Sequence, residues 1–247
     1  MSKLLIIFLF IYLIGSDVTA SGVVVYRNES MPWCGTVDGK DAGITIDILN
    51  AVTKYGGPTF NFIAVPWKRA QVLIQNNRGT AIIPFTRTAT REQHHTWIIE
   101  LVPNQVRLTM ARKPTLKVSV PSPPTLVNFK NSGIGIIRGS AVIPAMKTLG
   151  FTNLYEVNKA EQLAKMLNTG RFVAMAESKW VDNYVWNKIG QKGDDLIVGP
   201  NVGGIKYIFL GAALNFPPEL THQIRTAMEK VRKSGALDKI LNKWTKL

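Results

Sequence analysis

The chain is poor in cysteine and histidine, with one cysteine and three histidines in 247 residues. Cys34 has no partner for an intramolecular disulfide, so fold stability must come from the apolar core. Met31-Pro32-Trp33 before it is not a lipobox, which argues against lipid anchoring at this cysteine. Adjacent side chains such as those of His94-His95 point in different directions, and His222 is far off, which argues against a zinc site.

No arrangement of Ser, His and Asp, or of Cys and His, is typical of nucleophilic catalysis in this sequence. Cys34 would need an activating histidine nearby in space, which a sequence does not show. We therefore expect a protein that is not an enzyme, with no catalytic residue, no metal and no cofactor.

Acidic residues are also few, with 16 Asp and Glu against 30 Lys and Arg and a net charge of +14. The excess is spread out, as +2 over residues 21–103, +7 over 104–205 and +5 over 206–247, without a dense basic run. A nucleic-acid-binding protein usually concentrates its charge on one element, so we expect no nucleic-acid partner. The first interpretation of the excess positive charge is that it keeps the protein soluble. The alternatives are that it steers anions to the protein or holds the protein near an anionic envelope surface.

Long apolar runs are missing after the amino terminus. Lys3 and the apolar stretch Leu4–Ile14 form a leader too short to span a bilayer, and Val18-Thr19-Ala20 is a plausible cleavage site. An uncleaved membrane anchor is the alternative. We expect a signal peptide over residues 1–20, a mature start at Ser21 and export of a soluble protein to the periplasm.

Apolar periodicity and turn signals predict two series of alternating strands and helices. In the first series, the pattern predicts strands at 23–27, 60–65 and 80–83 with helices at 44–55 and 66–77 between them. This order is typical of a parallel sheet with crossover helices. A stretch with prolines at 114, 121, 123 and 124 separates this series from a second one, which indicates two lobes.

The second series contains strands and helices of the same kinds. A strand is expected at 106–111, before the prolines, and the second series after them has expected strands at 134–138, 154–157, 172–176, 196–198 and 207–214. Ser140 is expected to cap a helix that runs to Leu149, and Asn158 with Glu161 to form a capping box for a helix that ends at Asn168. The chain would then end in a helix that starts at Pro217-Pro218 and a shorter one with an apolar stripe.

The segment from Ala81 to Glu92 carries the clearest signal for a site. An apolar strand end is followed at once by a cluster of hydroxyl and guanidinium groups: Thr86, Arg87, Thr88, Thr90 and Arg91. Ligands of open α/β sheets bind at the carboxyl ends of strands, and an Arg there fits a carboxylate bidentately. The cluster indicates a pocket for a small anion such as a carboxylate, or else a solvated loop.

Three further residues have alternative interpretations of the same kind. Ser140 could leave a helix amino terminus free to receive an anion, or be a plain N-cap. Glu177 follows an apolar strand and could receive an ammonium group, or be a surface carboxylate. Trp33 could stack on a ligand or cap the core.

The chain resembles the bacterial extracellular solute-binding proteins of family three, the polar amino-acid receptors of ABC importers. The resemblance covers the whole mature chain and is carried by Gly43–Ile48, Val65–Ala70, Phe85–Glu92, Gly135–Ser140 and Ser234–Trp244. It implies a two-lobed, hinged α/β fold of the type II periplasmic binding proteins, each lobe a mostly parallel sheet flanked by helices. Lobe 1 would be 21–103 and 206–247, and lobe 2 would be 104–205.

The resemblance also implies roles for individual residues. In the amino-acid-binding members, the arginine that matches Arg91 grips the α-carboxylate, assisted at the positions of Thr86 and of Gly139-Ser140. An acidic residue near Glu177 receives the α-amino group, and an aromatic, here Trp33, covers the side chain. Arg87 would add a second guanidinium and favour a more anionic ligand.

The sequence departs from the family pattern at two positions. Pro84 stands where a small hydroxyl residue is frequent, and Ala141 where a Ser or Thr often follows Ser140. The resemblance implies a monomeric receptor that passes a small carboxylate-bearing solute, such as a polar amino acid, to an ABC permease. The alternatives are a sensory or partner-binding pair of lobes with an altered cleft, and a cyclohexadienyl-type dehydratase that uses Glu177 as acid or base.

Overall fold

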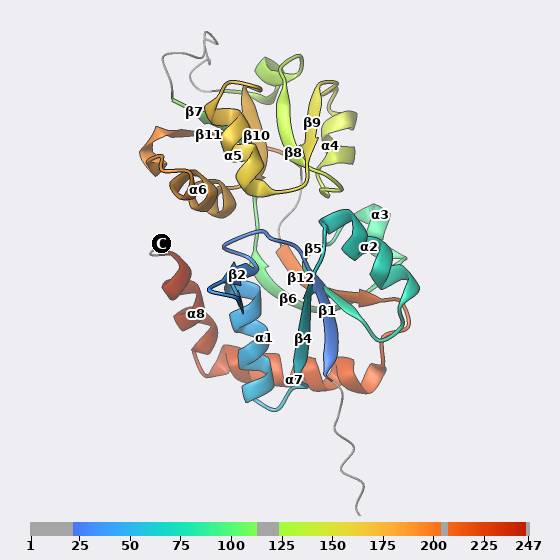
Figure 1. The fold of residues 1–247 in the computed structure, drawn as a ribbon. Coiled ribbons are helices and arrows are strands. Elements are labelled where there is room, and N and C mark those ends of the chain that lie inside the picture. Colours follow the sequence, from blue (N-terminus) through green and yellow to red (C-terminus); the bar gives the residue numbers. More distant parts are fainter. Residues whose placement is uncertain (1–21, 113–123, 204–206, 246–247) are drawn as a thin grey trace, which may run out of the picture.

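The computed structural model describes residues 22–112, 124–203 and 207–245, and it has two lobes (Figure 1). The predicted leader over residues 1–20 lies outside the described residues, as do Pro114, Pro121 and Pro123. No helix in the described ranges is both long and apolar enough to cross a membrane.

The first lobe is built on a five-stranded sheet. Its strand order is β4(Phe60–Ala64), β1(Val23–Arg27), β5(Ala81–Thr86), β12(Tyr207–Ala213), β6(His95–Pro103). Strand β1 is an inner strand and is largely buried, as its apolar run requires, and it pairs in parallel with β4 and β5. Strand β12 pairs antiparallel with β5 and β6, so the sheet is mixed.

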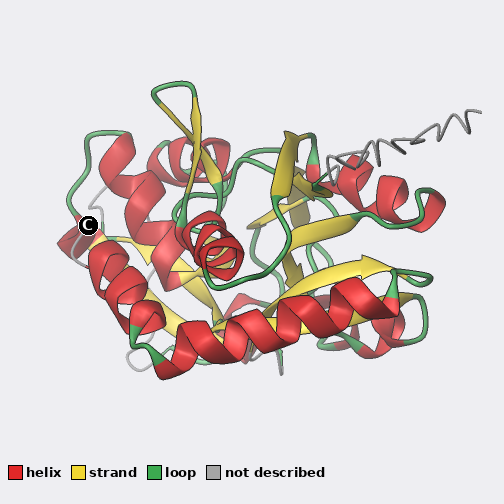
Figure 2. Cartoon of the chain, turned by 90° about the horizontal axis from the view of Figure 1, so that it is seen from below, coloured by secondary structure: helices red, strands yellow, loops and turns green. Residues whose placement is uncertain are grey.

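Helices cover this sheet. They are α1(Ile44–Lys54), α2(Trp67–Asn76), α3(Ala89–Glu92), α7(Pro218–Lys233) and α8(Ala236–Thr245). In α1 the side chains of Ile44, Ile48 and Val52, which share one face of the helix, are fully buried. Figure 2 shows the long α7 running beneath the strands of this lobe. A small hairpin, β2(Gly35–Val37) with β3(Lys40–Ala42), follows β1.

The second lobe repeats the arrangement on a smaller scale. Its strand order is β11(Leu196–Asn201), β7(Val106–Ala111), β10(Ala174–Ser178), β8(Ile134–Ile137), β9(Leu154–Val157). The remaining elements are α4(Ile143–Thr148), α5(Ala160–Asn168), α6(Lys179–Lys188) and the 3-10 turns η1(Leu126–Phe129) and η2(Gly193–Asp195). This sheet is mixed as well, because β7 runs antiparallel to β10 and β11.

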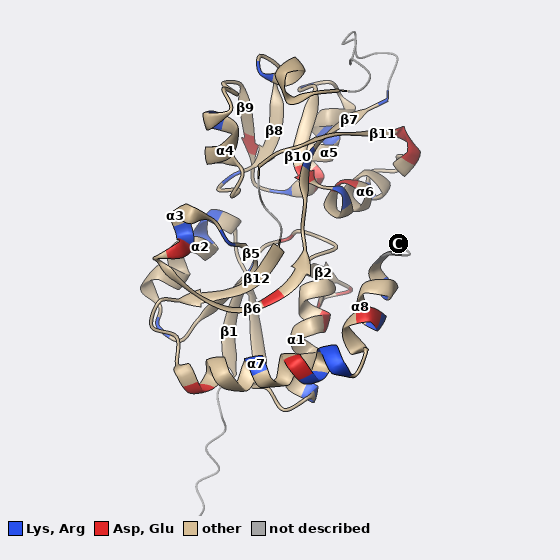
Figure 3. Ribbon diagram, turned by 180° about the vertical axis from the view of Figure 1, so that it is seen from behind, with Lys and Arg blue, Asp and Glu red and all other residues tan. Residues whose placement is uncertain are grey.

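Two chain segments connect the lobes. The first connection leads from β6, which ends at Pro103 in the first sheet, to β7, which begins at Val106 in the second. The second connection leads back from β11, which ends at Asn201, to β12, which begins at Tyr207 in the first sheet. The expected boundary at 103/104 falls in the first segment, whereas 205/206 lies outside the described residues. The residue-level boundaries therefore stay a prediction. Lys and Arg are scattered over both lobes rather than gathered on one element (Figure 3).

Strand ends differ from the sequence-based expectation where distant segments pair. The strand expected to end at Ile83 continues to Thr86, because β12 pairs with Phe85 and Thr86. The strand expected at 172–176 instead spans 174–178, because β7 pairs with Glu177 and Ser178. Strand β6 was not predicted at all. Its run Thr96–Val102 is rich in aromatic and branched side chains, a local strand signal that the sequence-based reasoning did not use.

Both expected helix caps in the second lobe are wrong. Helix α4 begins at Ile143 with Val142 at the N-cap, because Gly139, at φ +74°, turns the chain out of β8 before the helix starts. Helix α5 has Lys159 at its N-cap without a side-chain cap, so Asn158 and Glu161 form no capping box. Ser140 accordingly belongs to the turn before α4.

Candidate functional site

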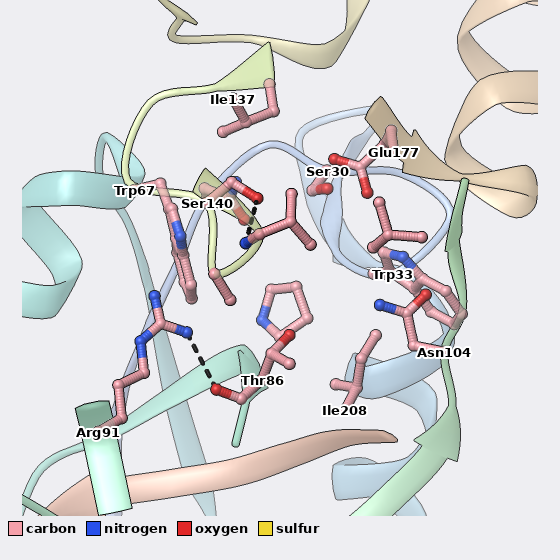
Figure 4. A pocket seen from close by; sticks show the side chains of 15 residues that line it. Ser30, Trp33, Trp67, Thr86, Arg91, Asn104, Ile137, Ser140, Glu177 and Ile208 are labelled. Carbon is pink, nitrogen blue, oxygen red and sulfur yellow. Dashed lines mark hydrogen bonds between the residues drawn. The ribbon is translucent and has the colours of Figure 1, made fainter. Parts of the chain in front are cut away.

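A cavity lies between the two lobes, at the carboxyl ends of β1 and β5 (Figure 4). This is the edge at which open α/β sheets bind ligands. The first lobe lines it with Asn28, Ser30, Trp33, Trp67, Pro84, Thr86, Arg91 and Ile208, and the rest of the lining is Asn104, Val106, Ile137, Ser140, Ala141, Val142 and Glu177.

Arg91 is the positively charged residue among those that line this cavity. One guanidinium nitrogen donates to the carbonyl of Thr86 at 3.0 Å, and the other donates to Oε1 of Gln71 at 3.0 Å and to the carbonyl of Gly139 at 3.2 Å. The guanidinium lies over the ring of Phe85, 4.5 Å from its centroid. No carboxylate of the described residues pairs with Arg91, and burial lowers the pKa of Arg91 to about 10. A half-buried, unpaired cation is the feature that an anionic ligand would complete.

The Gly139 carbonyl joins the lobes. It belongs to the second lobe and accepts from Arg91 and, at 3.2 Å, from Nε2 of Gln71 in α2 of the first lobe. A Cβ at Gly139 would lie 3.0 Å from Nε2 of Gln71, so a larger residue would displace the Gln71 amide from this carbonyl. We call these two hydrogen bonds the Gly139 contact.

The carboxyl group of Glu177 lies across the cavity from Arg91 (Figure 4). It accepts a hydrogen bond at 2.9 Å from the backbone N–H of Ser178. Burial raises the pKa of Glu177 to about 7, against which that hydrogen bond acts only weakly. Asn104, on the segment that connects β6 to β7, is buried, and its Oδ1 has no hydrogen-bond partner among the described residues. Both side chains can accept from an ammonium group.

Two tryptophans wall the cavity. Trp33 is buried, and its ring contacts that of Trp180 in the second lobe, with centroids 5.8 Å apart. Trp67, at the first position of α2, is also buried and stands on the side of Arg91 (Figure 4). Flat apolar walls with polar groups at two ends are typical of a small-molecule site.

Arg27, at the end of β1, holds the loop that carries Asn28 and Ser30. Its buried guanidinium donates to Oδ1 of Asp41 at 2.7 Å, to Oε1 of Glu29 at 2.7 Å and to Oγ1 of Thr36 at 2.9 Å. These bonds tie the β2–β3 hairpin to the strand end and so fix the loop beside the cavity.

The structure brings together most of the predicted site residues. Trp33, Thr86, Arg91, Ser140 and Glu177 line the cavity, while Gly139 contributes only its carbonyl. Pro84 and Ala141, the two departures from the family pattern, line it too.

Arg87 does not reach the cavity. Its exposed side chain pairs with Glu92, with Nε donating to Oε2 at 2.7 Å, and lies over the rings of Trp97 and Phe209. The expected second guanidinium at the ligand is therefore not placed there, because β5 continues to Thr86 and directs residue 87 to the outer side of the lobe.

Besides four aliphatic residues, four polar or aromatic lining residues escaped sequence reasoning as ligand contacts: Asn28, Ser30, Trp67 and Asn104. Asn28 directly follows β1, so the rule that singled out Thr86 would also have indicated Asn28. Asn104 and Gln105 are two polar residues between β6 and β7, which is a weaker signal.

The space left between these groups is small. The cavity measures about 60 Å³, far less than the roughly 300–1,000 Å³ of sites that hold a drug-sized ligand. The two lobes must therefore separate, and the Gly139 contact must break, before a ligand larger than a few waters can enter. Among the described residues no group of three or more His, Cys, Asp or Glu is arranged to hold a metal ion.

Comparison with known proteins identifies the family. The model of the bacterial extracellular solute-binding proteins, family 3, matches residues 23–247. The chain belongs to this family. Members of the family and their structural neighbours are binding proteins, although one neighbour is a sensor domain. A comparison with curated protein sequences found no match.

Solved structures of similar fold cover nearly the whole solute-binding chain. The arginine-, lysine-, histidine-binding protein ArtJ of Geobacillus stearothermophilus is 20% identical, with a TM-score of 0.76 over 90% of this chain and 94% of its own. The GluR0 ligand-binding core of Nostoc punctiforme, solved with L-glutamate, is 15% identical, with a TM-score of 0.75 over 90% and 98%. A histidine kinase sensor domain is 14% identical, with a TM-score of 0.80 over 91% and 96%. At these identities the similarity shows the fold, a two-lobed type II periplasmic binding protein.

Proposed function

We propose that this solute-binding protein captures a small carboxylate-bearing ligand, such as a polar amino acid or a related organic anion, between its lobes. The observation that carries the proposal is Arg91, a half-buried guanidinium without an acidic partner among the described residues, faced across the cavity by Glu177 and Asn104. A zwitterion would place its carboxylate at Arg91 and its ammonium at the other two. The protein acts as a receptor rather than as an enzyme.

Binding would exchange a protein contact for a ligand contact. The ligand carboxylate takes the place of the Gly139 carbonyl on Arg91 and accepts a charge-assisted, bidentate hydrogen bond, which is stronger than a bond to a neutral carbonyl. The lobes then close again with the ligand between them, a hinge motion common in two-lobed binding proteins.

Calorimetry on the purified chain tests the proposal. We expect at least one ligand from a panel of amino acids and small organic acids to bind, and its carboxamide derivative to lose affinity. Arg91→Gln should weaken binding by at least about 30-fold, since removal of one partner of a buried charge pair costs ~2–5 kcal/mol. Arg87→Gln is the matched control, because Arg87 lies outside the cavity and should leave affinity unchanged. Equal affinity in Arg91→Gln would remove the proposed role.

We further propose that the receptor works in the periplasm as a monomer and delivers its ligand to the permease of an ABC importer. Uptake of the radiolabelled ligand by the source bacterium, with the gene deleted and then complemented, tests delivery. Restoration by the native gene but not by Arg91→Gln is expected. Uptake that does not depend on the gene would contradict import and favour a sensory role.

A further inference from the structure

A second, larger chamber adjoins the cavity on the far side of Arg91. It measures about 520 Å³, within the range of ligand sites, and shares Arg91, Ser140 and Ala141 with the inner cavity. A further hollow of about 680 Å³, beside the segments that connect the lobes, shares only Asn104 with that cavity. We call the chamber beside Arg91 the outer chamber. Because it shares three lining residues with the inner cavity, it is the space into which a ligand bound at Arg91 would extend.

The outer chamber is cationic. Lys68, Arg91 and Arg138 line it against a single carboxylate, that of Glu156, so its formal charge is +2. The Arg138–Glu156 pair is weak, with 3.8 Å between Nε and Oε2 and with both side chains partly exposed. Lys68 forms no ion pair with a described residue. An anion can bind here without breaking a strong internal pair.

Hydroxyl groups and the Gly139 contact complete this chamber. Oγ1 of Thr88 and Oγ1 of Thr90 lie 3.1 Å apart on its wall. The stem of Lys68 packs close to Gly139, since a Cβ there would lie 3.4 Å from Cδ of Lys68. The Lys68 ammonium belongs to the first lobe and the Arg138 guanidinium to the second, so an anion between them would draw the lobes together.

We propose that the ligand carries a second anionic group, a carboxylate or a phosphate, which binds in the outer chamber between Lys68 and Arg138 while the first carboxylate binds Arg91. This inference rests on the proposed function and narrows it to dianionic acids. The second anion, not Arg87, supplies the preference for a more acidic ligand, because Arg87 lies outside both spaces.

Matched ligand pairs test the proposal by calorimetry on the full chain: L-glutamate with L-glutamine, succinate with succinamate, and O-phospho-L-serine with L-serine. The acidic member of at least one pair should bind at least tenfold more tightly than its neutral partner. Lys68→Gln and Arg138→Gln should each lower the affinity of that acid by roughly tenfold, as for a partly exposed charged hydrogen bond. The affinity of the neutral partner should not change. The carboxylate and phosphate pairs show which anion is preferred.

Two control variants each remove one positive charge, as Lys68→Gln and Arg138→Gln do. Arg69→Gln removes an exposed cation next to Lys68 on α2, and Arg171→Gln removes an exposed cation of the second lobe; neither residue lines the outer chamber. Both controls should bind every ligand as the native chain does.

Several outcomes would overturn the inference. Equal affinity for the acid and its neutral partner would do so, as would equal losses for both in Lys68→Gln and Arg138→Gln. A drop confined to the association rate at low salt, with dissociation unchanged, would indicate steering only. In each case binding that still depends on Arg91 leaves the proposed function standing, whereas no binding of any ligand removes both.

Discussion

Burial shifts the pKa of both ionisable groups that line the cavity, Arg91 and Glu177, so that the neutral form of each is favoured. It lowers the pKa of Arg91 to about 10 and raises the pKa of Glu177 to about 7. At neutral pH Arg91 therefore keeps its charge, while Glu177 is near its midpoint. A carboxylic acid is neutral below its pKa, so Glu177 attracts an ammonium group only as the pH rises past about 7.

The affinity for an amino-acid ligand should consequently depend on pH through Glu177. Between pH 8 and pH 6 we expect affinity to fall, approaching tenfold per pH unit below the pKa if binding needs the ionised carboxylate. Glu177→Gln should bind more weakly at pH 8 and show a flat profile over this interval. Calorimetry at half-unit steps measures both. The same slope in Glu177→Gln would show that another group titrates.

Among the elements, the start of each second-lobe helix depends on how the preceding strand ends. Strand β10 passes directly into α6, and Oγ of the buried Ser178 accepts from the N–H of Val181 at 3.3 Å. Strand β8 is followed by a turn, so Ser140 stands three residues before the first residue of α4. The same residue type is thus a cap in one place and a turn residue in the other.

Ser178→Ala should therefore destabilise the unliganded protein, and Ser140→Ala should not. Loss of an N-cap costs about 1 kcal/mol, which for a chain of this size lowers Tm by roughly 2–4 °C. Thermal unfolding followed by circular dichroism compares the two variants. Equal Tm values in both would remove Ser178 as a cap of α6.

At the scale of the whole molecule, the Gly139 contact connects two lobes that each have their own sheet. One cluster of buried apolar residues continues from the first lobe into the second, and a separate cluster belongs to the second lobe alone. The contact between the lobes therefore includes apolar side chains as well as the polar Gly139 contact.

Gly139→Ala should weaken the Gly139 contact. The new Cβ would lie 3.0 Å from Nε2 of Gln71 and displace that amide, so ligand affinity, measured by calorimetry, should change. Gly190→Ala is the matched control in the same lobe. Its φ of +78° resembles the +74° of Gly139, but nothing lies within 4 Å of its Cβ position. Both variants carry the strain of a left-handed residue, ~1–2 kcal/mol, so an equal change in both would contradict the steric role.

Much of the fold follows from local patterns in the sequence. The apolar face of α1, the buried run of β1 and the alternation of strands and helices all reflect burial of one side of each element, which local periodicity encodes. The position of Arg91 shortly after a strand indicated an anion site, because ligands of open α/β sheets bind at the carboxyl ends of strands. The extension of β5 to Thr86 was missed and the caps of α4 and α5 were wrongly predicted, since each depends on a distant partner or on the turn before it. Strand β6 was overlooked although its own residues indicate a strand.

The sequence alone determined that this chain forms alternating βα units in two groups and that guanidinium groups follow the strand at Ala81. Only the tertiary structure decided that Arg91 faces the cavity while Arg87 pairs with Glu92, and that the Gly139 carbonyl meets Arg91 across the lobes. The physical reason is that composition and periodicity determine which surfaces must be buried, whereas the direction of one side chain depends on strand pairing and lobe closure between segments far apart in the chain.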